Sequence, residues 1–203
     1  MKRKDLEHLI RAAGAIIEES EILVIGSQSI LGEHPDAPAE LTMSSEADLG
    51  SIRSPEKWNL IDVTLGELSG FHQTFGYYAQ GIEPKTAILP RGWETRLVPI
   101  NNVNTLGITG RCLETHDLVA SKLFAGREKD IDFCTACIRH EFVDCGLLRS
   151  RLIDSGQDRC LIEAALTKLR ICSSRLLNSE VVCDRCGAVP CVCNSGGQPP
   201  SPS

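Results

Sequence analysis

Two short motifs in the first fifty residues carry groups that could do phosphate chemistry. Gly26-Ser27 follows an apolar run, and Glu46-Ala47-Asp48 comes later in the chain. A turn and the helix start after it offer backbone N–H groups to phosphate oxygens, and strand alternation sends Glu46 and Asp48 to one face, where both can ligate Mg²⁺ or Mn²⁺. A bound metal neutralises phosphate charge and aligns an attacking hydroxyl with a leaving pyrophosphate. Together these groups suit a metal-bound triphosphate.

Each motif also has an ordinary structural interpretation. A Gly-Ser dipeptide after a strand is most often a simple turn, and two carboxylates on a strand usually form a solvated face. What favours the phosphate-binding interpretation is the order and separation of the two motifs along the chain.

The elements that must position these motifs can be predicted from hydrophobic periodicity. Apolar residues at helical spacing from Asp5 to Glu18 predict an amphipathic helix against a sheet. The β-branched run Ile22–Ile25 predicts a buried central strand that stops at the Gly-Ser turn. The prolines and polar residues between Gly32 and Ser45 indicate a loop, and Glu46–Leu49 predicts a second short strand.

The middle of the chain is less regular. Residues 55–80 have a mostly helical pattern that glycines interrupt. Lys85–Leu89 and Thr95–Ile100 predict paired strands around a Pro90-Arg91-Gly92 turn, and the sheet is expected to end near Cys112.

A helical half follows the sheet. Thr115 can cap a first helix, and further helical periodicity continues through Ile138, from Cys145 to Asp154 and from Asp158 to Leu177. We therefore expect an α/β (α+β) domain over residues 1–178, with a sheet-containing part at about 5–112 and a helical part at about 113–178. Residues 179–203 are expected to form a Cys-rich and then disordered tail.

Composition limits the class of protein. The chain has 203 residues, a formal net charge of -6 and no apolar run long enough for a membrane span. We expect a cytoplasmic protein that does not bind membranes, and the acidic balance gives no overall attraction for nucleic acid. Ten cysteines without an export signal indicate reduced thiols.

The two motifs resemble the DNA polymerase beta-like nucleotidyltransferase superfamily, whose signature is a Gly-Ser turn followed by an acidic-x-acidic pair. Three further stretches, Phe75–Gly81, Leu89–Trp93 and Asp117–Asp130, are similar to an uncharacterised bacterial branch related to the nucleotidyltransferase toxins of abortive-infection systems. The resemblance covers roughly residues 5–150. It implies the minimal nucleotidyltransferase fold, a small mixed sheet flanked by helices with a helical C-terminal half.

The resemblance also implies roles for individual residues. Gly26 and Ser27 match the phosphate-contacting turn, and Glu46 and Asp48 match the metal ligands and catalytic carboxylates. The nucleotide-binding positions in the last motif are Lys122, Arg127, Lys129 and Asp130, of which the three cations face the phosphates and Asp130 matches a later acidic position. Without the resemblance, Lys122 would be a snorkelling side chain and residues 127–130 a solvated helix start.

The match departs from the family pattern in three ways. The interval from Ser27 to Glu46 is longer than in the most compact members, and Glu46 stands where Asp is commoner. A third carboxylate, which active members carry on a later strand, is missing from Thr95–Ile100, and Glu94 and Asp62 are poor substitutes.

The cysteines allow a separate metal hypothesis. The four thiols that could hold a structural Zn²⁺ are Cys183, Cys186, Cys191 and Cys193. Their short intervening loop strains a tetrahedron, so a reduced, metal-free tail is the alternative. Cys134, Cys137, His140 and Cys145 could be arranged as a second set, but the helical pattern around Cys134 favours core packing.

Two functions are consistent with these features. The first is a Mg²⁺-dependent nucleotidyltransferase that moves a nucleoside monophosphate from a nucleoside triphosphate to a hydroxyl on RNA, protein or a small molecule, as one half of a toxin–antitoxin pair with an antitoxin-like partner. The second is a catalytically degenerate module that binds a nucleotide or another protein. Both require that Gly26, Ser27, Glu46, Asp48 and Lys122 converge on one pocket.

Overall fold

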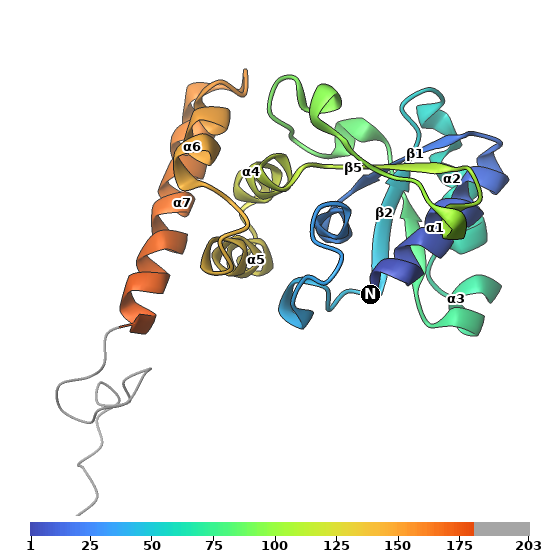
Figure 1. The fold of residues 1–203 in the computed structure, drawn as a ribbon. Helices are drawn as coiled ribbons and strands as arrows, with labels where there is room; N and C mark the ends of the chain where they lie inside the picture. The colour runs from blue at the N-terminus through green and yellow to red at the C-terminus, as the bar shows by residue number, and fades with distance from the viewer. Residues whose placement is uncertain (181–203) are drawn as a thin grey trace, which may run out of the picture.

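Five strands form a single mixed sheet in the computed structural model, which describes residues 1–180 (Figure 1). They are β1 (Glu21–Ile25), β2 (Glu46–Gly50), β3 (Tyr78–Gly81), β4 (Val98–Ile100) and β5 (Thr109–Cys112). Their order is β3-β2-β1-β5-β4. β1 is antiparallel to β2 and parallel to β5, while β3 is parallel to β2 and β4 antiparallel to β5.

Helices accompany the sheet and then continue beyond it. The described helices are α1 (Arg3–Ile17), α2 (Trp58–Leu65), α3 (Gly70–Phe75), α4 (Thr115–Ala125), α5 (Glu128–Arg139), α6 (Cys145–Ile153) and α7 (Arg159–Glu180). Figure 1 shows α4 and α5 between the sheet and the pair α6 and α7. The fold class expected from the sequence, with its mixed sheet and helical second half, is confirmed.

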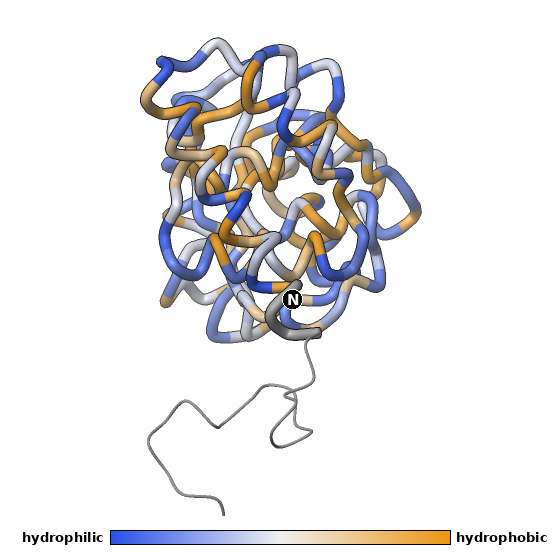
Figure 2. Tube along the Cα trace, turned by 90° about the vertical axis from the view of Figure 1, so that its left-hand side faces the viewer, coloured by the Kyte–Doolittle hydropathy of each residue, from blue (hydrophilic) through white to orange (hydrophobic). Residues whose placement is uncertain are grey.

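Helix α1 packs closely on the sheet because its apolar stripe meets a glycine there. Leu6, Leu9 and Ile10 are fully buried, and each such side chain contributes about 1.5–3 kcal/mol. Ile10 lies against Gly110 of β5, where an added Cβ would overlap its side chain. Hydrophobic stretches run through the middle of the trace, and hydrophilic stretches make up many of the outer turns (Figure 2).

Two predictions about the middle of the chain are wrong. Lys85–Leu89 is not a strand, because Pro84 starts a 3-10 turn over Pro84–Thr86 instead. Of Thr95–Ile100, only Val98–Ile100 is extended, and it pairs with β5. The edge strand β3 lies at the end of the stretch that the pattern indicated as helical.

A buried ion cluster joins α4 to the rest of the fold. The Asp117 carboxylate is fully buried and accepts hydrogen bonds at 2.7 Å and 3.0 Å from Arg96, which precedes β4. Arg151 of α6 lies 3.1 Å from the same carboxylate and also pairs with Glu114. Burial alone would raise the pKa of Glu114, but hydrogen bonds from His116 and Arg151 lower it to about 2. These contacts fix the first turn of α4 against the sheet side and against α6.

Removing the Asp117 carboxylate should lower the stability of the fold. Asp117→Ala leaves two partly buried guanidinium groups without their shared partner, so we expect a loss of about 3 kcal/mol in the free energy of unfolding. Chemical denaturation measures it. The matched control is Glu163→Ala, which breaks the exposed Arg159–Glu163 pair on α7 and should leave the unfolding midpoint unchanged. Equal midpoints for the two variants would contradict a structural role for the cluster.

Candidate active site

The site is built around a close approach between two neighbouring strands. Ile25, the last residue of β1, pairs with Asp48 of β2, and this register places the Asp48 carboxylate directly against Gly26. Gly26 has a φ of 69°, and a Cβ at that position would overlap a carboxylate oxygen of Asp48. Glycine is therefore required here both by backbone conformation and by space. The helix that the sequence suggested after the turn is a short 3-10 helix, Ser27–Gly32.

The two carboxylates of β2 lie on one face of the strand, as strand alternation predicts. Glu46 and Asp48 are partly exposed, whereas Ala47 between them is buried. The Tyr78 hydroxyl on β3 donates a hydrogen bond to Glu46 Oε2 at 2.8 Å. This contact restrains the partly exposed Glu46 carboxylate beside β3.

Asp48 is the more perturbed of the pair. Burial and, to a lesser extent, the charge of Glu46 raise the pKa of its carboxyl to about 6. Lys122, Arg127 and Lys129 act in the opposite direction. A carboxylate pair that has to share a small space in this way would gain from a cation between its oxygens.

All three cations expected at the site come from the α4–α5 junction. Lys122 Nζ lies 3.2 Å from Asp130 Oδ1 and 4.5 Å from the centroid of the Phe133 ring. Arg127 Nε donates to Asp130 Oδ2 at 2.7 Å. The Asp130 side chain is fully buried; burial raises its pKa, but hydrogen bonding to Arg127 and the charge of Lys122 outweigh that effect and lower it. Asp130 thus holds two of the cations, while Lys129 projects from the start of α5.

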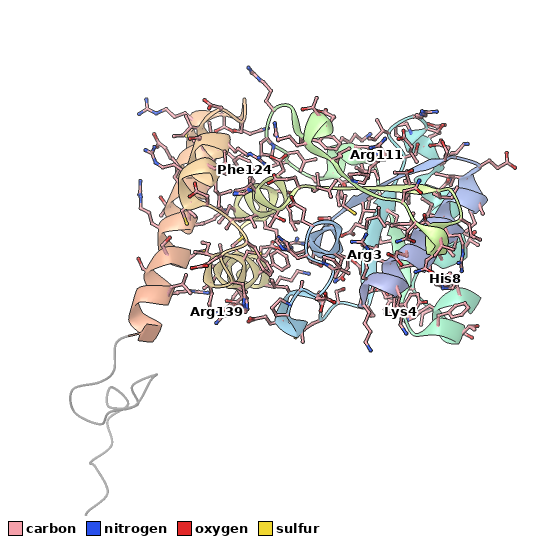
Figure 3. The ribbon with its side chains drawn as sticks, viewed as in Figure 1. Arg3, Lys4, His8, Arg111, Phe124 and Arg139 are labelled. Atoms are coloured by element: carbon pink, nitrogen blue, oxygen red, sulfur yellow. The ribbon has the colours of Figure 1, made fainter. Side chains whose placement is uncertain are left out.

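The structure brings the other sequence-derived residues together in one cavity of about 530 Å³. Its lining includes Gly26, Ser27, Glu46, Asp48, Lys122, Arg127 and Lys129. Asp130 is not in that lining. The lining also includes Met43, 81% exposed, and Glu40, which pairs at 2.6 Å with Arg139. Figure 3 labels Arg139 on α5.

A second, smaller cavity of about 250 Å³ adjoins the first. Gly26, Asp48, Lys122 and Arg127 line both cavities, so these four residues lie at the junction between them. This second cavity was not predicted, because Thr86, Ala87 and Ile88 of its lining lie in Lys85–Leu89, where a strand had been expected.

Sequence reasoning also missed Gln80. It stands opposite Asp48 in the β2–β3 register and lines the larger cavity with both carboxylates. The two residues considered as substitutes for the missing third carboxylate do not line the cavity. Asp62 on α2 accepts from the Gly81 N–H at 3.3 Å, and Glu94 lies in the 3-10 turn Trp93–Arg96. The period-two pattern of Tyr78–Gly81 was the only signal for this strand, and four residues are too few to show it clearly.

The donor set suits Mg²⁺ brought in with phosphate better than a metal held by protein alone. Within residues 1–180, no group of three or more His, Cys, Asp or Glu side chains is placed to hold a metal ion. Mg²⁺ commonly binds through one or two carboxylates plus substrate phosphates. Glu46 and Asp48 provide that number of ligands, and Gln80 adds a neutral amide oxygen beside them.

The cysteines considered as metal ligands fall into two groups. Cys134 and Cys137 are buried in the helical core, and burial raises the pKa of Cys137 to about 12. Core packing, rather than a metal set with His140 and Cys145, is therefore their role. The proposed zinc ligands Cys183, Cys186, Cys191 and Cys193 lie outside the described residues.

Comparison with known families identifies the family of this chain. Residues 4–170 match a family described as nucleotidyltransferase of unknown function (DUF6036), and the chain belongs to this family. Neither the curated proteins nor the solved structures that were searched contain a match. Within residues 1–180, none of the helices combines the length and apolar character that a bilayer span requires.

The raised pKa of Asp48 should make stability fall as pH rises. The pKa of Asp48 is 3.8 in the unfolded chain and about 6 in the folded one, so between these pH values the native state binds more protons than the unfolded state. Above about pH 6 the carboxylate is charged in both states, and the full cost of burying that charge lowers the free energy of unfolding. In metal-free buffer, Asp48→Asn should raise the free energy of unfolding at pH 8 by on the order of 1–3 kcal/mol. The gain should shrink toward pH 4. Denaturation at both pH values measures it, and a gain that is larger at the lower pH would contradict the assignment.

Proposed function

We propose that this chain is a metal-dependent nucleotidyltransferase that moves a nucleoside monophosphate from a nucleoside triphosphate to a hydroxyl acceptor. The observation that carries the proposal is the larger cavity, where two carboxylates on one strand face three cations and the Gly-Ser turn. Family membership supports a nucleotide substrate. The chain's resemblance to abortive-infection toxins supports a toxin–antitoxin role, which an adjacent reading frame for a small regulator would test.

The proposed roles of the residues follow from their charges. Ser27, Lys122, Arg127 and Lys129 supply hydroxyl and cationic groups for phosphate oxygens, and Asp130 holds the first two cations of the α4–α5 junction in place. Glu46 and Asp48 would hold Mg²⁺ or Mn²⁺, which when bound would neutralise phosphate charge and align the reacting groups. Phosphoryl transfer depends mainly on such positioning and electrostatics.

A specific observation favours the alternative of a module that binds nucleotide without turnover. The residue opposite Asp48 is Gln80, whose amide carries no charge and cannot accept a proton as a carboxylate does. If deprotonation of the acceptor requires a third carboxylate at this place, binding would persist without transfer.

Neutralising the acidic pair should separate these two functions. In the double variant Glu46→Gln/Asp48→Asn, transfer of label from α-phosphate-labelled nucleotides to total RNA, protein or small molecules should fall to background. The assay is run with Mg²⁺ and with Mn²⁺. The matched control, Asp36→Asn/Glu56→Gln, removes two exposed carboxylates and should keep parental activity. A parent that binds nucleotide but transfers no more label than the double variant would overturn the enzyme proposal in favour of the binding module.

Lys122 should contribute mainly to affinity for the triphosphate. Losing a charged contact to phosphate costs on the order of 1.5–3 kcal/mol, so Lys122→Ala should weaken nucleoside triphosphate binding about ten- to a hundredfold. Calorimetric titration measures the change. Lys4→Ala removes an exposed lysine from α1 and should not alter binding. Unchanged affinity in Lys122→Ala would remove this residue from the phosphate site.

A further inference from the structure

The smaller cavity has a different chemical character from the larger one. Beyond the junction residues, its walls are mainly apolar: Ile25, Ile82, Ala87, Ile88, Leu118 and Ala125. The remaining groups are the neutral hydroxyl side chains of Thr86 and Ser121. All charged side chains among its lining residues belong to the junction that it shares with the larger cavity.

The larger cavity is where the most highly charged part of the donor fits. Ser27 and Lys129 line only that cavity, and Lys122 and Arg127 stand between it and the smaller one. The pyrophosphate portion of a nucleoside triphosphate therefore has its cationic and hydroxyl partners in the larger cavity. The phosphorus that reacts then lies near the junction, beside Asp48.

The reaction geometry gives the two cavities different occupants. In phosphoryl transfer the attacking and leaving oxygens are roughly in line on opposite sides of the phosphorus. With pyrophosphate leaving into the larger cavity, the attacking hydroxyl must approach from the other side of the junction. The smaller cavity is the space that adjoins the larger one at this junction, and Asp48 lines both cavities.

We propose that the smaller cavity is the acceptor subsite and that it takes a hydroxyl borne by an uncharged, apolar group. This inference rests on the proposed function. The hydroxyl oxygen forms a bond to the α-phosphorus, the bond from that phosphorus to the pyrophosphate oxygen breaks, and the hydroxyl proton passes to solvent. The products are the nucleotidylated acceptor and pyrophosphate.

An RNA end is a poor fit for the same walls. Each nucleotide of an RNA chain brings a phosphate, which would have to lie on the apolar wall without a cation beyond the junction. Lys85, which precedes the lining residue Thr86 in the chain, is already paired with Glu83. Either a protein side chain or a small molecule can provide an uncharged hydroxyl-bearing group, so both sources are tested below.

The binding test needs no turnover. Methyl-labelled protein is titrated with p-cresol, as a small-molecule source, and with N-acetyltyrosinamide, as a peptide source, in the presence of Mg²⁺ and a non-hydrolysable nucleotide. We expect at least one probe to shift the methyl resonances of Ile82, Ile88 and Leu118. The exposed methyl of Ile171 on α7, which lines neither cavity, should not shift. No shift from either probe would overturn the inference, whatever the enzyme does.

Filling the cavity tests its role. Ala125 is exposed at the end of α4, so Ala125→Phe can place a ring in the cavity without entering the core. Ala164→Phe adds the same ring to an exposed position of α7 and serves as the control. Ala125→Phe should abolish the probe shifts and lower transfer to protein or small-molecule acceptors by about tenfold or more, with nucleotide affinity within about twofold of the parent. The control should behave as the parent.

The remaining outcomes distinguish this inference from the proposed function. Equal loss of nucleotide affinity and transfer in Ala125→Phe would assign the cavity to the donor nucleoside, which overturns the acceptor subsite and leaves the transferase intact. Transfer to RNA that Ala125→Phe leaves unchanged would also overturn it. A second exposed variant, Ile88→Lys, puts a charge on the apolar wall and should weaken the probe shifts in the same way. Unchanged shifts in that variant would contradict an apolar subsite.

Discussion

The arrangement of the site depends on the partly buried carboxylate of Asp48. This carboxylate packs directly against the backbone of Gly26, where there is no room for a side chain. The β1–β2 register brings this carboxylate to Gly26, and the neighbouring Glu46 adds a second negative charge. An isolated acidic pair in such a position is costly, and the fold offsets the cost with cations from a different part of the chain. The helical half is thus tied electrostatically to the sheet as well as packed against it.

How those cations are presented depends on a second buried carboxylate. Asp130 accepts from Lys122 and Arg127 and so fixes two long side chains, which reduces the rotamer entropy that they would lose on binding the proposed phosphate ligand. The two acidic groups therefore have different relations to the same cations. Asp130 is in direct contact with Lys122 and Arg127, while Asp48 faces them across open space that a ligand can enter.

The sequence alone was informative where a pattern was long or chemically unusual. The fifteen residues of α1 repeat their apolar positions several times, and the apolar run of β1 ends at a turn, so both elements could be predicted. The acidic pair could be predicted because two carboxylates one residue apart are chemically unusual on a strand. Tyr78–Gly81 could not, since four residues on a sheet edge bury only one face and pair through backbone groups that every residue has. Missing that strand also hid Gln80. The inward orientation of Asp130 depends on packing between α4 and α5, which no local pattern reveals.

The last turn of α4, which follows Lys122, is also stabilised by a contact from helix α7. Lys168 of α7 donates to the backbone carbonyl oxygens of Leu123 at 2.9 Å and Phe124 at 3.4 Å, directly after Lys122. Carbonyl groups at a helix end lack partners within the helix, so this ammonium group acts as a remote cap. A fragment ending before α7 would retain every residue of the two cavities yet leave the last turn of α4 free to fray. Helix α7 therefore belongs to the minimal functional unit, although it contributes no side chain to either cavity.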